Sequence, residues 1–240
     1  MSDRGPVRVE LAQWHDQLVV VKRLQAFSST VQERLKREAE VVQKLKHDNI
    51  IQLLAAEDDR IIYAYCSGVS LEEALMGGAI RLRRAVKIAS DVLAALDYAH
   101  NLGVIHCDVK PANIMIKGDA ALLTDFGFAK DLALTAITAH GMCLGTPNYM
   151  APEQFEGNRS DRRSDLYAVG AVLYHMLSGA PPYGSQVIRF LAGDDRLKLA
   201  PLPGEAAAVQ EVVRRALARS VAARFETAAE MLEALKLAGR

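Results

Sequence analysis

The sequence lacks three features that would each point to a particular class of protein. It has only 3 cysteines in 240 residues, without CxxC pairs, which favours reduced thiols over a disulfide framework or a zinc site. Basic and acidic residues number 29 each, so no excess charge favours nucleic acid or an anionic membrane. No apolar run approaches the roughly 18 residues of a spanning helix. We therefore expect a soluble, cytoplasmic chain that binds neither nucleic acid nor membrane.

The patterns that are present place strands first and helices later. β-branched runs at residues 18–24 and 60–66 predict two buried strands. Between them, residues 30–47 carry apolar side chains at three- and four-residue intervals, which predicts an amphipathic helix on a small sheet. From Ser67 onward helical patterns dominate, and a segment that is apolar nearly all round ends at Gly179.

The middle of the chain predicts a helix followed by a hairpin. Residues 83–100 repeat apolar side chains at helical spacing and stop before Gly103, a residue suited to a left-handed cap. Two short apolar runs, 113–116 and 121–124, flank the turn residues Gly118 and Asp119. The two runs are therefore expected to pair.

Four charged residues that could take part in catalysis lie in four short sequence motifs, which follow one another along the chain. Lys22 ends "VVVK", Glu38 lies in "REAE", Asp108 lies in "HCDVKPAN" and Asp125 lies in "TDFG". Each string alone is a weak signal, but the ordered set is specific. From about Gly5 to Arg240 the sequence resembles a eukaryotic-type Ser/Thr protein kinase of bacterial appearance.

This resemblance implies an α+β, bilobal protein-kinase fold. One kinase domain would span residues 1–240, with a small β-rich N-lobe (1–66) and a larger helical C-lobe (67–240). The implied activity is transfer of the γ-phosphoryl group of ATP to a serine or threonine hydroxyl of a protein, with Mg²⁺ as the metal.

Phosphoryl transfer needs positive charge on the phosphates, a base near the attacking hydroxyl and a metal. By the resemblance, Lys22 would hold the α- and β-phosphates and form an ion pair with Glu38. Asp108 would accept or orient the hydroxyl proton, and Lys110 would offset charge on the transferring phosphate.

The remaining ligand contacts also follow from the resemblance. Asn113 and Asp125 would supply the oxygen ligands that Mg²⁺ prefers. His106 and Phe126 would be packing residues. The nucleotide would contact the side chains or backbone of five positions: Val7, Val20, Ala64, Cys66 and Met115.

The string "GTPNYMAPE", from Gly145 to Glu153, resembles the segment on which a protein substrate docks. Glu153 would pair with Arg224, tying this segment to the C-terminal helices. Asp165 would brace the catalytic loop through backbone amides, although it is equally placed to be a simple N-cap.

The sequence departs from the family pattern at three points. Only Gly5 and Val7 remain of the glycine-rich loop that covers the phosphates, so most of the first strand is expected to be missing. A start codon placed too late, a deliberate truncation, or a natural kinase that binds nucleotide with half of this loop would each explain it. Val20 replaces an alanine above the adenine. Cys107 stands where many kinases have an arginine that binds a phosphate on the activation loop.

Two functions remain open at this point. An active Ser/Thr kinase is favoured, because every charged residue that the chemistry needs is present. Its activity should not depend strongly on phosphorylation of Thr135 or Thr138, because Cys107 cannot bind phosphate. The alternative is a pseudokinase that serves as a nucleotide sensor or scaffold, because the glycine-rich loop is incomplete.

Overall fold

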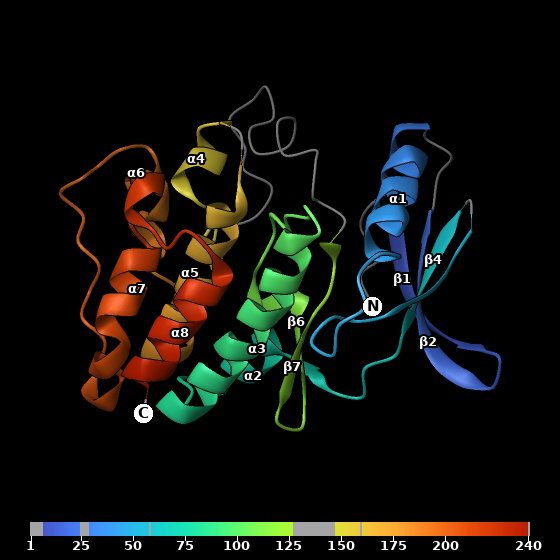
Figure 1. Ribbon diagram of the computed structural model, residues 1–240, viewed down its shortest axis with the longest axis horizontal. Coiled ribbons are helices and arrows are strands. Elements are labelled where there is room, and N and C mark those ends of the chain that lie inside the picture. The colour runs from blue at the N-terminus through green and yellow to red at the C-terminus, as the bar shows by residue number, and fades with distance from the viewer. Residues whose placement is uncertain (1–6, 25–28, 58, 127–146, 159, 240) are drawn as a thin grey trace.

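The computed structural model describes residues 7–24, 29–57, 59–126, 147–158 and 160–239; the side chains of Val7 and Glu38 are among a few within these ranges that it leaves undescribed. A sheet with one long helix forms one end of the molecule, and a group of helices forms the other (Figure 1). No helix in these ranges is both long and apolar enough to span a membrane.

The sheet at the N-terminal end has four antiparallel strands in the order β1-β2-β4-β3. Their bounds are β1 (Val7–Trp14), β2 (Gln17–Leu24), β3 (Leu53–Ala56) and β4 (Arg60–Ala64). Strands β2 and β4 confirm the two predicted from β-branched runs. Val19, Val21 and Ile62 are buried where these two strands pair.

Strand β1 is not among the strands predicted above, although Val9 and Leu11 alternate there with charged residues. It joins β2 through His15 and Asp16, whose φ angles are 45° and 61°. Two positive φ angles give the hairpin turn that matches the twist of the flanking strands. The prediction that a strand before β1 is largely missing concerns residues 1–6, which lie outside the described residues.

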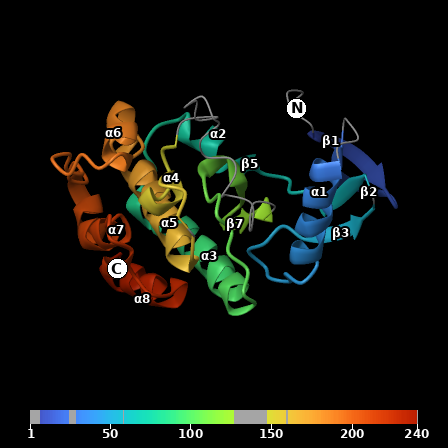
Figure 2. The same cartoon turned by 90° about the horizontal axis from the view of Figure 1, so that it is seen from above.

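Helix α1 (Ser29–Val42) packs on β3 and β4, as the amphipathic pattern predicts (Figure 2). Ala39 and Val42 are buried on the sheet side, whereas Glu40 is exposed. This contact places α1 beside β4, the strand that pairs with β2 at Lys22.

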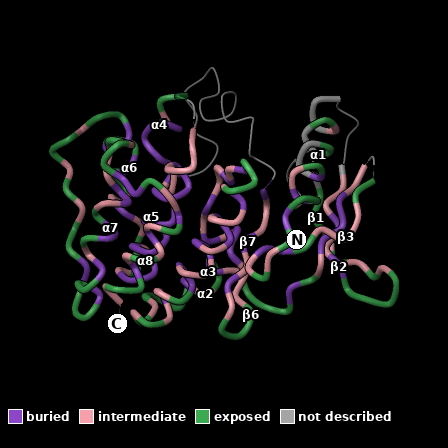
Figure 3. The backbone as a smooth tube through the Cα atoms, in the orientation of Figure 1, coloured by how far each residue is buried: buried purple, intermediate pink, exposed green. Residues whose placement is uncertain are grey.

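The helical part is built around α5 (Arg162–Ser178), which is buried along most of its length (Figure 3). Helix α3 (Leu82–Asn101) packs against α5 and α8 (Ala228–Ala238). Gly103 follows α3 with φ 73°, which confirms the predicted left-handed cap, and α5 ends at Gly179 (φ 80°), as predicted.

Within the described residues, this part also contains four shorter helices: α2 (Leu71–Leu75), α4 (Pro152–Phe155), α6 (Val187–Leu191) and α7 (Gln210–Ala216). Short 3₁₀ segments occur at Pro111–Asn113, Gly184–Gln186, Gly204–Val209 and Val221–Ala223. Helices α5 and α7 approach closely at Gly170, where an added Cβ would lie 2.6 Å from the Cβ of Ala216.

The predicted hairpin is confirmed as β6 (Ile114–Lys117) and β7 (Ala120–Leu123), with β5 (Val69–Ser70) on its other side. Ile114 pairs with Leu123. The hairpin therefore brings Asn113, just before β6, close to Asp125, two residues after β7.

Candidate active site

The loop between α3 and β6 is held from below by Asp165 in the first turn of α5. The Asp165 carboxylate accepts hydrogen bonds from the backbone N–H of His106 (2.9 Å) and of Cys107 (2.7 Å). It also lies 2.8 Å from Nε2 of His100. Asp165 is 1% exposed, so it braces the loop from inside the helical core, as the sequence predicts.

The alternative interpretation of Asp165 as an N-cap is wrong. Helix α5 is capped by Asp161, whose Oδ1 accepts the N–H of Arg163 at 2.7 Å. Asp165 lies one turn later, where its side chain faces the loop rather than its own helix terminus.

The catalytic-loop residues predicted from the sequence converge on one carboxylate oxygen. Oδ2 of Asp108 accepts from Nζ of Lys110 at 2.7 Å and from Nδ2 of Asn113 at 3.0 Å. Nδ2 of Asn113 also donates to the backbone carbonyl of Asp108 at 2.8 Å. Within the described residues no hydrogen bond is made to Oδ1 of Asp108, and the side chain is 26% exposed. Both side-chain donors of the loop therefore bind the other oxygen of this carboxylate, Oδ2.

A long-range ion pair joins the N-terminal sheet to the segment after β7 in the helical part. Nζ of Lys22 on β2 lies 2.9 Å from Oδ1 of Asp125, which is 103 residues away in the chain. Burial acts to raise the pKa of the Asp125 carboxyl, but the charge and hydrogen bond of Lys22, together with His106 and Lys110, outweigh it and the pKa is lowered. Asp125 is thus a carboxylate at neutral pH.

The ion pair between Lys22 and Glu38 stays a prediction. Glu38 lies within α1, but its side chain is outside the described part of the structure. The contact between Lys22 and Asp125 was not predicted. Both residues were expected to face the nucleotide, and the observed pair places them on the same side of the site.

His106 connects the catalytic loop to the Asp125 segment. Its Nδ1 accepts the N–H of Asp108 at 3.2 Å, so Nε2 carries the ring proton and donates to the carbonyl of Thr124 at 2.9 Å. The ring centroids of His106 and Phe126 are 4.6 Å apart, and both residues are fully buried. The predicted packing role of these two side chains is confirmed.

The docking segment is described from Pro147 onward, whereas Gly145 and Thr146 lie outside the described residues. The Glu153 carboxylate accepts two hydrogen bonds from the guanidinium of Arg224, both at 2.7 Å, and one from Oγ of Ser164 at 2.7 Å. Burial acts to raise the pKa of Glu153, but the Arg224 guanidinium, together with the Ser164 hydroxyl and a backbone hydrogen bond, outweighs it and the pKa is lowered. The predicted pair is confirmed.

The predicted nucleotide-contacting residues lie around the junction between the sheet and the helical part. Val20 and Met115 are both partly buried against the main core. Ala64 ends β4, and the Cys66 carbonyl accepts the N–H of Gly68 at 2.9 Å. The Cys66 N–H donates no hydrogen bond within the described ranges. Val7 begins β1, and its side chain is undescribed.

Comparison with known proteins agrees with this geometry. Residues 3–232 match the model of the protein kinase domain. The chain belongs to the protein kinase domain family. The kinase domain is 37% identical over 215 residues to the serine/threonine-protein kinase PknB of Mycolicibacterium smegmatis, covering 82% of the chain and 34% of that protein.

Further relatives are bacterial kinases of the same type. The serine/threonine-protein kinase PknJ of Mycobacterium tuberculosis is 36% identical over 219 residues, covering 84% of this kinase domain and 37% of that protein. The chain thus spans about a third of the length of the curated relatives it matches, 34% for PknB.

A crystal structure of the PknI kinase domain of M. tuberculosis superposes with a TM-score of 0.74 at 27% identity, covering 96% of this chain and 89% of that one. A double mutant of the same domain gives a TM-score of 0.76, with 98% and 91% covered. The α+β, bilobal fold implied by the sequence resemblance is therefore confirmed, with the sheet as the smaller lobe and the helices as the larger one.

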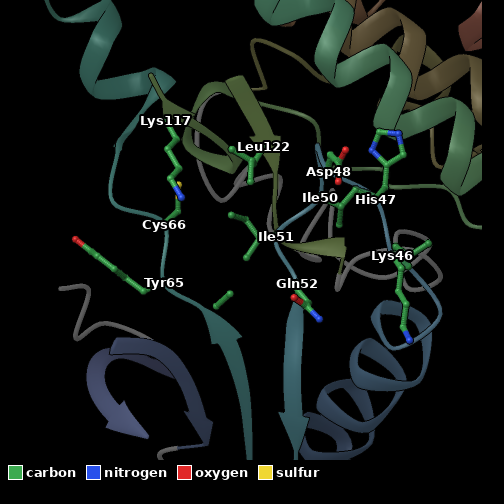
Figure 4. Close-up of a pocket in the computed structure, with 12 residues that line it drawn as sticks. Lys46, His47, Asp48, Ile50, Ile51, Gln52, Tyr65, Cys66, Lys117 and Leu122 are labelled. Carbon is green, nitrogen blue, oxygen red and sulfur yellow. The ribbon is translucent and has the colours of Figure 1, made fainter. Parts of the chain in front are cut away.

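One pocket of about 450 Å³ lies elsewhere in the kinase domain (Figure 4). It borders Ala64 and Cys66, but it contains none of Lys22, Asp108 or Asp125. Its other walls come from the segment after α1, from the residue after Ala64 and from the β6–β7 hairpin: Leu45, Lys46, His47, Asp48, Ile50, Ile51, Gln52, Tyr65, Lys117 and Leu122. It is therefore not the phosphate site.

One contact near the catalytic loop is absent from the sequence predictions. Nε2 of Gln154 donates to the backbone carbonyl of Cys107 at 3.0 Å. No motif identifies such a contact in advance, because the acceptor is a backbone group and glutamine carries no charge.

Proposed function

We propose that the kinase domain transfers the γ-phosphoryl group of ATP to a serine or threonine hydroxyl of a protein. The observation that carries the proposal is the convergence of Lys110 and Asn113 on Asp108, with the Lys22–Asp125 ion pair at the edge of the same hairpin. The names of the relatives support the same reaction and the same acceptor class.

Asp108 is the group that would meet the attacking hydroxyl. Because Lys110 and Asn113 occupy its Oδ2, its Oδ1 is the oxygen that remains to accept or orient the hydroxyl proton. Lys110 then lies next to the site of attack, where its charge offsets that of the transferring phosphate.

Asn113 and Asp125 fit a Mg²⁺ site. The side-chain nitrogen of Asn113 donates to Asp108, which leaves Oδ1 of Asn113 to serve as a metal ligand. Asp125 offers a carboxylate. Mg²⁺ is commonly bound by one or two protein oxygens together with phosphate oxygens and water. When bound, it would neutralise charge on the β- and γ-phosphates.

Lys22 would bind the α- and β-phosphates, with Glu38 as its partner. Because Nζ of Lys22 is already 2.9 Å from Asp125, the cation for the phosphates and the carboxylate for the metal are adjacent. Val7, Val20 and Met115 would contact the adenosine, and the backbone of Ala64 and Cys66 would hydrogen-bond the adenine.

Activity would not depend strongly on phosphorylation of the activation loop. Burial, with the carboxylates of Asp165 and Asp108, raises the pKa of the Cys107 thiol to about 12, so this position carries no charge that could attract phosphate. Thr135 and Thr138 lie outside the described residues. The protein substrate would dock along Gly145 to Glu153.

The test is phosphate transfer by the purified chain with Mg²⁺ and labelled ATP, using a mixture of histones as the acceptor. Asp108→Asn and Asp125→Ala should abolish transfer, and Asp119→Asn, in the exposed hairpin turn, is the matched control. Transfer that persists in Asp108→Asn would refute the catalytic role of the Asp108 carboxylate. No transfer by the parent, with no thermal shift on adding Mg-ATP, would instead establish the pseudokinase alternative.

A further inference from the structure

The side chain of Gln154 joins two segments of the proposed active site. Gln154 lies in α4, directly after the docking segment, and is 5% exposed. Its Nε2 donates to the Cys107 carbonyl at 3.0 Å, and its Oε1 accepts the N–H of Ala151 at 3.0 Å. One amide therefore holds a backbone group of the docking segment and a backbone group of the catalytic loop.

The residue that Gln154 holds has an uncommon backbone conformation. Cys107 has φ 65°, a left-handed value that a residue with a Cβ keeps only where its surroundings hold it. Its N–H donates to Oδ1 of Asp165 at 2.7 Å, and its carbonyl accepts from Gln154. Both backbone polar groups of the residue before Asp108 are thus fixed by buried side chains.

We propose that Gln154 is a positioning residue that sets the docking segment relative to Asp108 without any phosphate group. The inference rests on the proposed kinase function. A phosphate clamp needs a cation before Asp108, whereas the amide of Gln154 needs only the backbone of that residue. The substrate hydroxyl is then presented to Asp108 by a contact that is permanent rather than switched.

A purely local role is the competing interpretation. Gln154 is the third residue of a four-residue helix, and the bond from the Ala151 N–H to its Oε1 is the reciprocal half of a capping box. Glutamate makes that bond as well as glutamine does. Only the bond from Nε2 to Cys107 reaches 47 positions along the chain, so the two roles can be separated by substitution.

Gln154→Glu keeps the capping acceptor and removes the donor, while Gln154→Met removes both at nearly the same length. Gln210→Met is the matched control. Gln210 is the first residue of α7, and its Oε1 also accepts a backbone N–H, that of Leu202 at 2.6 Å. The full chain is used, with histones as the acceptor. The measurements are kcat and KM for histones, KM for ATP, Mg-ATP hydrolysis without acceptor, and the melting temperature.

Both substitutions of Gln154 should lower kcat/KM for histones by about tenfold, the effect of losing one well-placed hydrogen bond. The KM for ATP should stay at the parent's value, because nucleotide binding does not need the docking segment. Hydrolysis without acceptor should fall less than transfer to histones, because it loses only the contact that holds the catalytic loop. Gln210→Met should lower the melting temperature and leave kcat/KM for histones unchanged.

Hydrogen exchange provides a readout that does not depend on turnover. Amides in residues 104–110 and 147–157 should exchange faster in both Gln154 variants than in the parent, and at the parent's rate in Gln210→Met. A Gln154→Glu protein that matches the parent in kcat/KM and in exchange would show that Gln154 is only a helix cap. A loss of activity proportional to the fraction of unfolded protein would overturn the inference equally.

The outcome also separates this inference from the proposed function. A parent chain that transfers no phosphate refutes both. An active parent whose Gln154 variants behave like Gln210→Met refutes the positioning role alone.

Discussion

Replacing Arg224 by methionine removes the charge partner of a buried carboxylate. Glu153 is 9% exposed and Arg224 is 3% exposed, and two hydrogen bonds of 2.7 Å join them. In Arg224→Met the carboxylate keeps only Oγ of Ser164. Breaking a buried ion pair on one side costs about 3–5 kcal/mol. For a domain of this size that corresponds to a fall in melting temperature of roughly 6–20 °C.

Glu153→Gln should cost less than Arg224→Met. The guanidinium of Arg224 also donates to the backbone carbonyls of Arg163, Ala218 and Arg219, and it lies 4.9 Å from the ring centroid of Tyr167. It therefore keeps several partners when Glu153 is neutral. Those carbonyls lose their donor in Arg224→Met, which adds to the cost of that change.

Calorimetric melting of the parent, both single variants and the double variant closes a mutant cycle. The double variant should lose less free energy of unfolding than the sum of the two single losses, by about 1 kcal/mol or more. The reason is that its second change removes a charge that the first had left unpaired. If the losses add, the two residues are not coupled and the assigned pair is wrong.

The pH dependence of the melting temperature provides an independent test of the charge on Glu153. Burial acts to raise the pKa of Glu153, but Arg224 holds it below the ordinary value of 4.5. A lowered folded-state pKa contributes stability above the unfolded value and loses it as pH falls through the folded value. In Arg224→Met only the Ser164 hydroxyl and a backbone hydrogen bond oppose burial, so the pKa of Glu153 lies above that in the parent and the gap in melting temperature should narrow from neutral pH to about pH 4. A constant gap would contradict a buried charge at Glu153.

Two further outcomes test local features of the fold. Gly170→Ala should destabilise the protein by about 1–2 kcal/mol although alanine is the better helix former, because its Cβ would lie 2.6 Å from that of Ala216. Adding Ala216→Gly to this variant should restore most of the lost stability. A Gly170→Ala protein more stable than the parent would refute the close approach of the two helices. Cys107, with its pKa raised to about 12, should react with iodoacetamide at pH 8 far more slowly than glutathione, as mapped by mass spectrometry; equal rates would show an accessible thiolate.

Local patterns predicted the elements, and the resemblance predicted most of the site. Asp108, Lys110 and Asn113 lie within six positions of one loop, so their convergence follows from a single short string. The Glu153–Arg224 pair joins residues 71 positions apart and is visible only through the family pattern. Strand β1 was missed because its alternating apolar residues, Val9 and Leu11, are exposed and give a weaker signal than a buried β-branched run.

What the sequence did not reveal are contacts in which one partner is the backbone. Gln154 binds a carbonyl and Asp165 binds two amides, and such partners leave no trace in residue types. The role of Asp165 was found only by resemblance, and that of Gln154 was not found. The Lys22–Asp125 pair is different, because both residues were assigned to the nucleotide and their mutual contact depends on the arrangement of the two lobes.

The first turn of α5 links the stability of the fold to the geometry of the proposed reaction. Ser164 and Asp165 are adjacent, both 1% exposed, and directly precede the mostly apolar, buried stretch Leu166–Leu173 of the same helix. Ser164 holds the Glu153 carboxylate of the docking segment, and Asp165 holds the amides before Asp108. Because a buried polar group left unpaired is costly, this turn can adopt little other than the observed arrangement. The same two residues therefore fix the segment on which we propose that the substrate docks and the loop that carries Asp108, the proposed catalytic carboxylate.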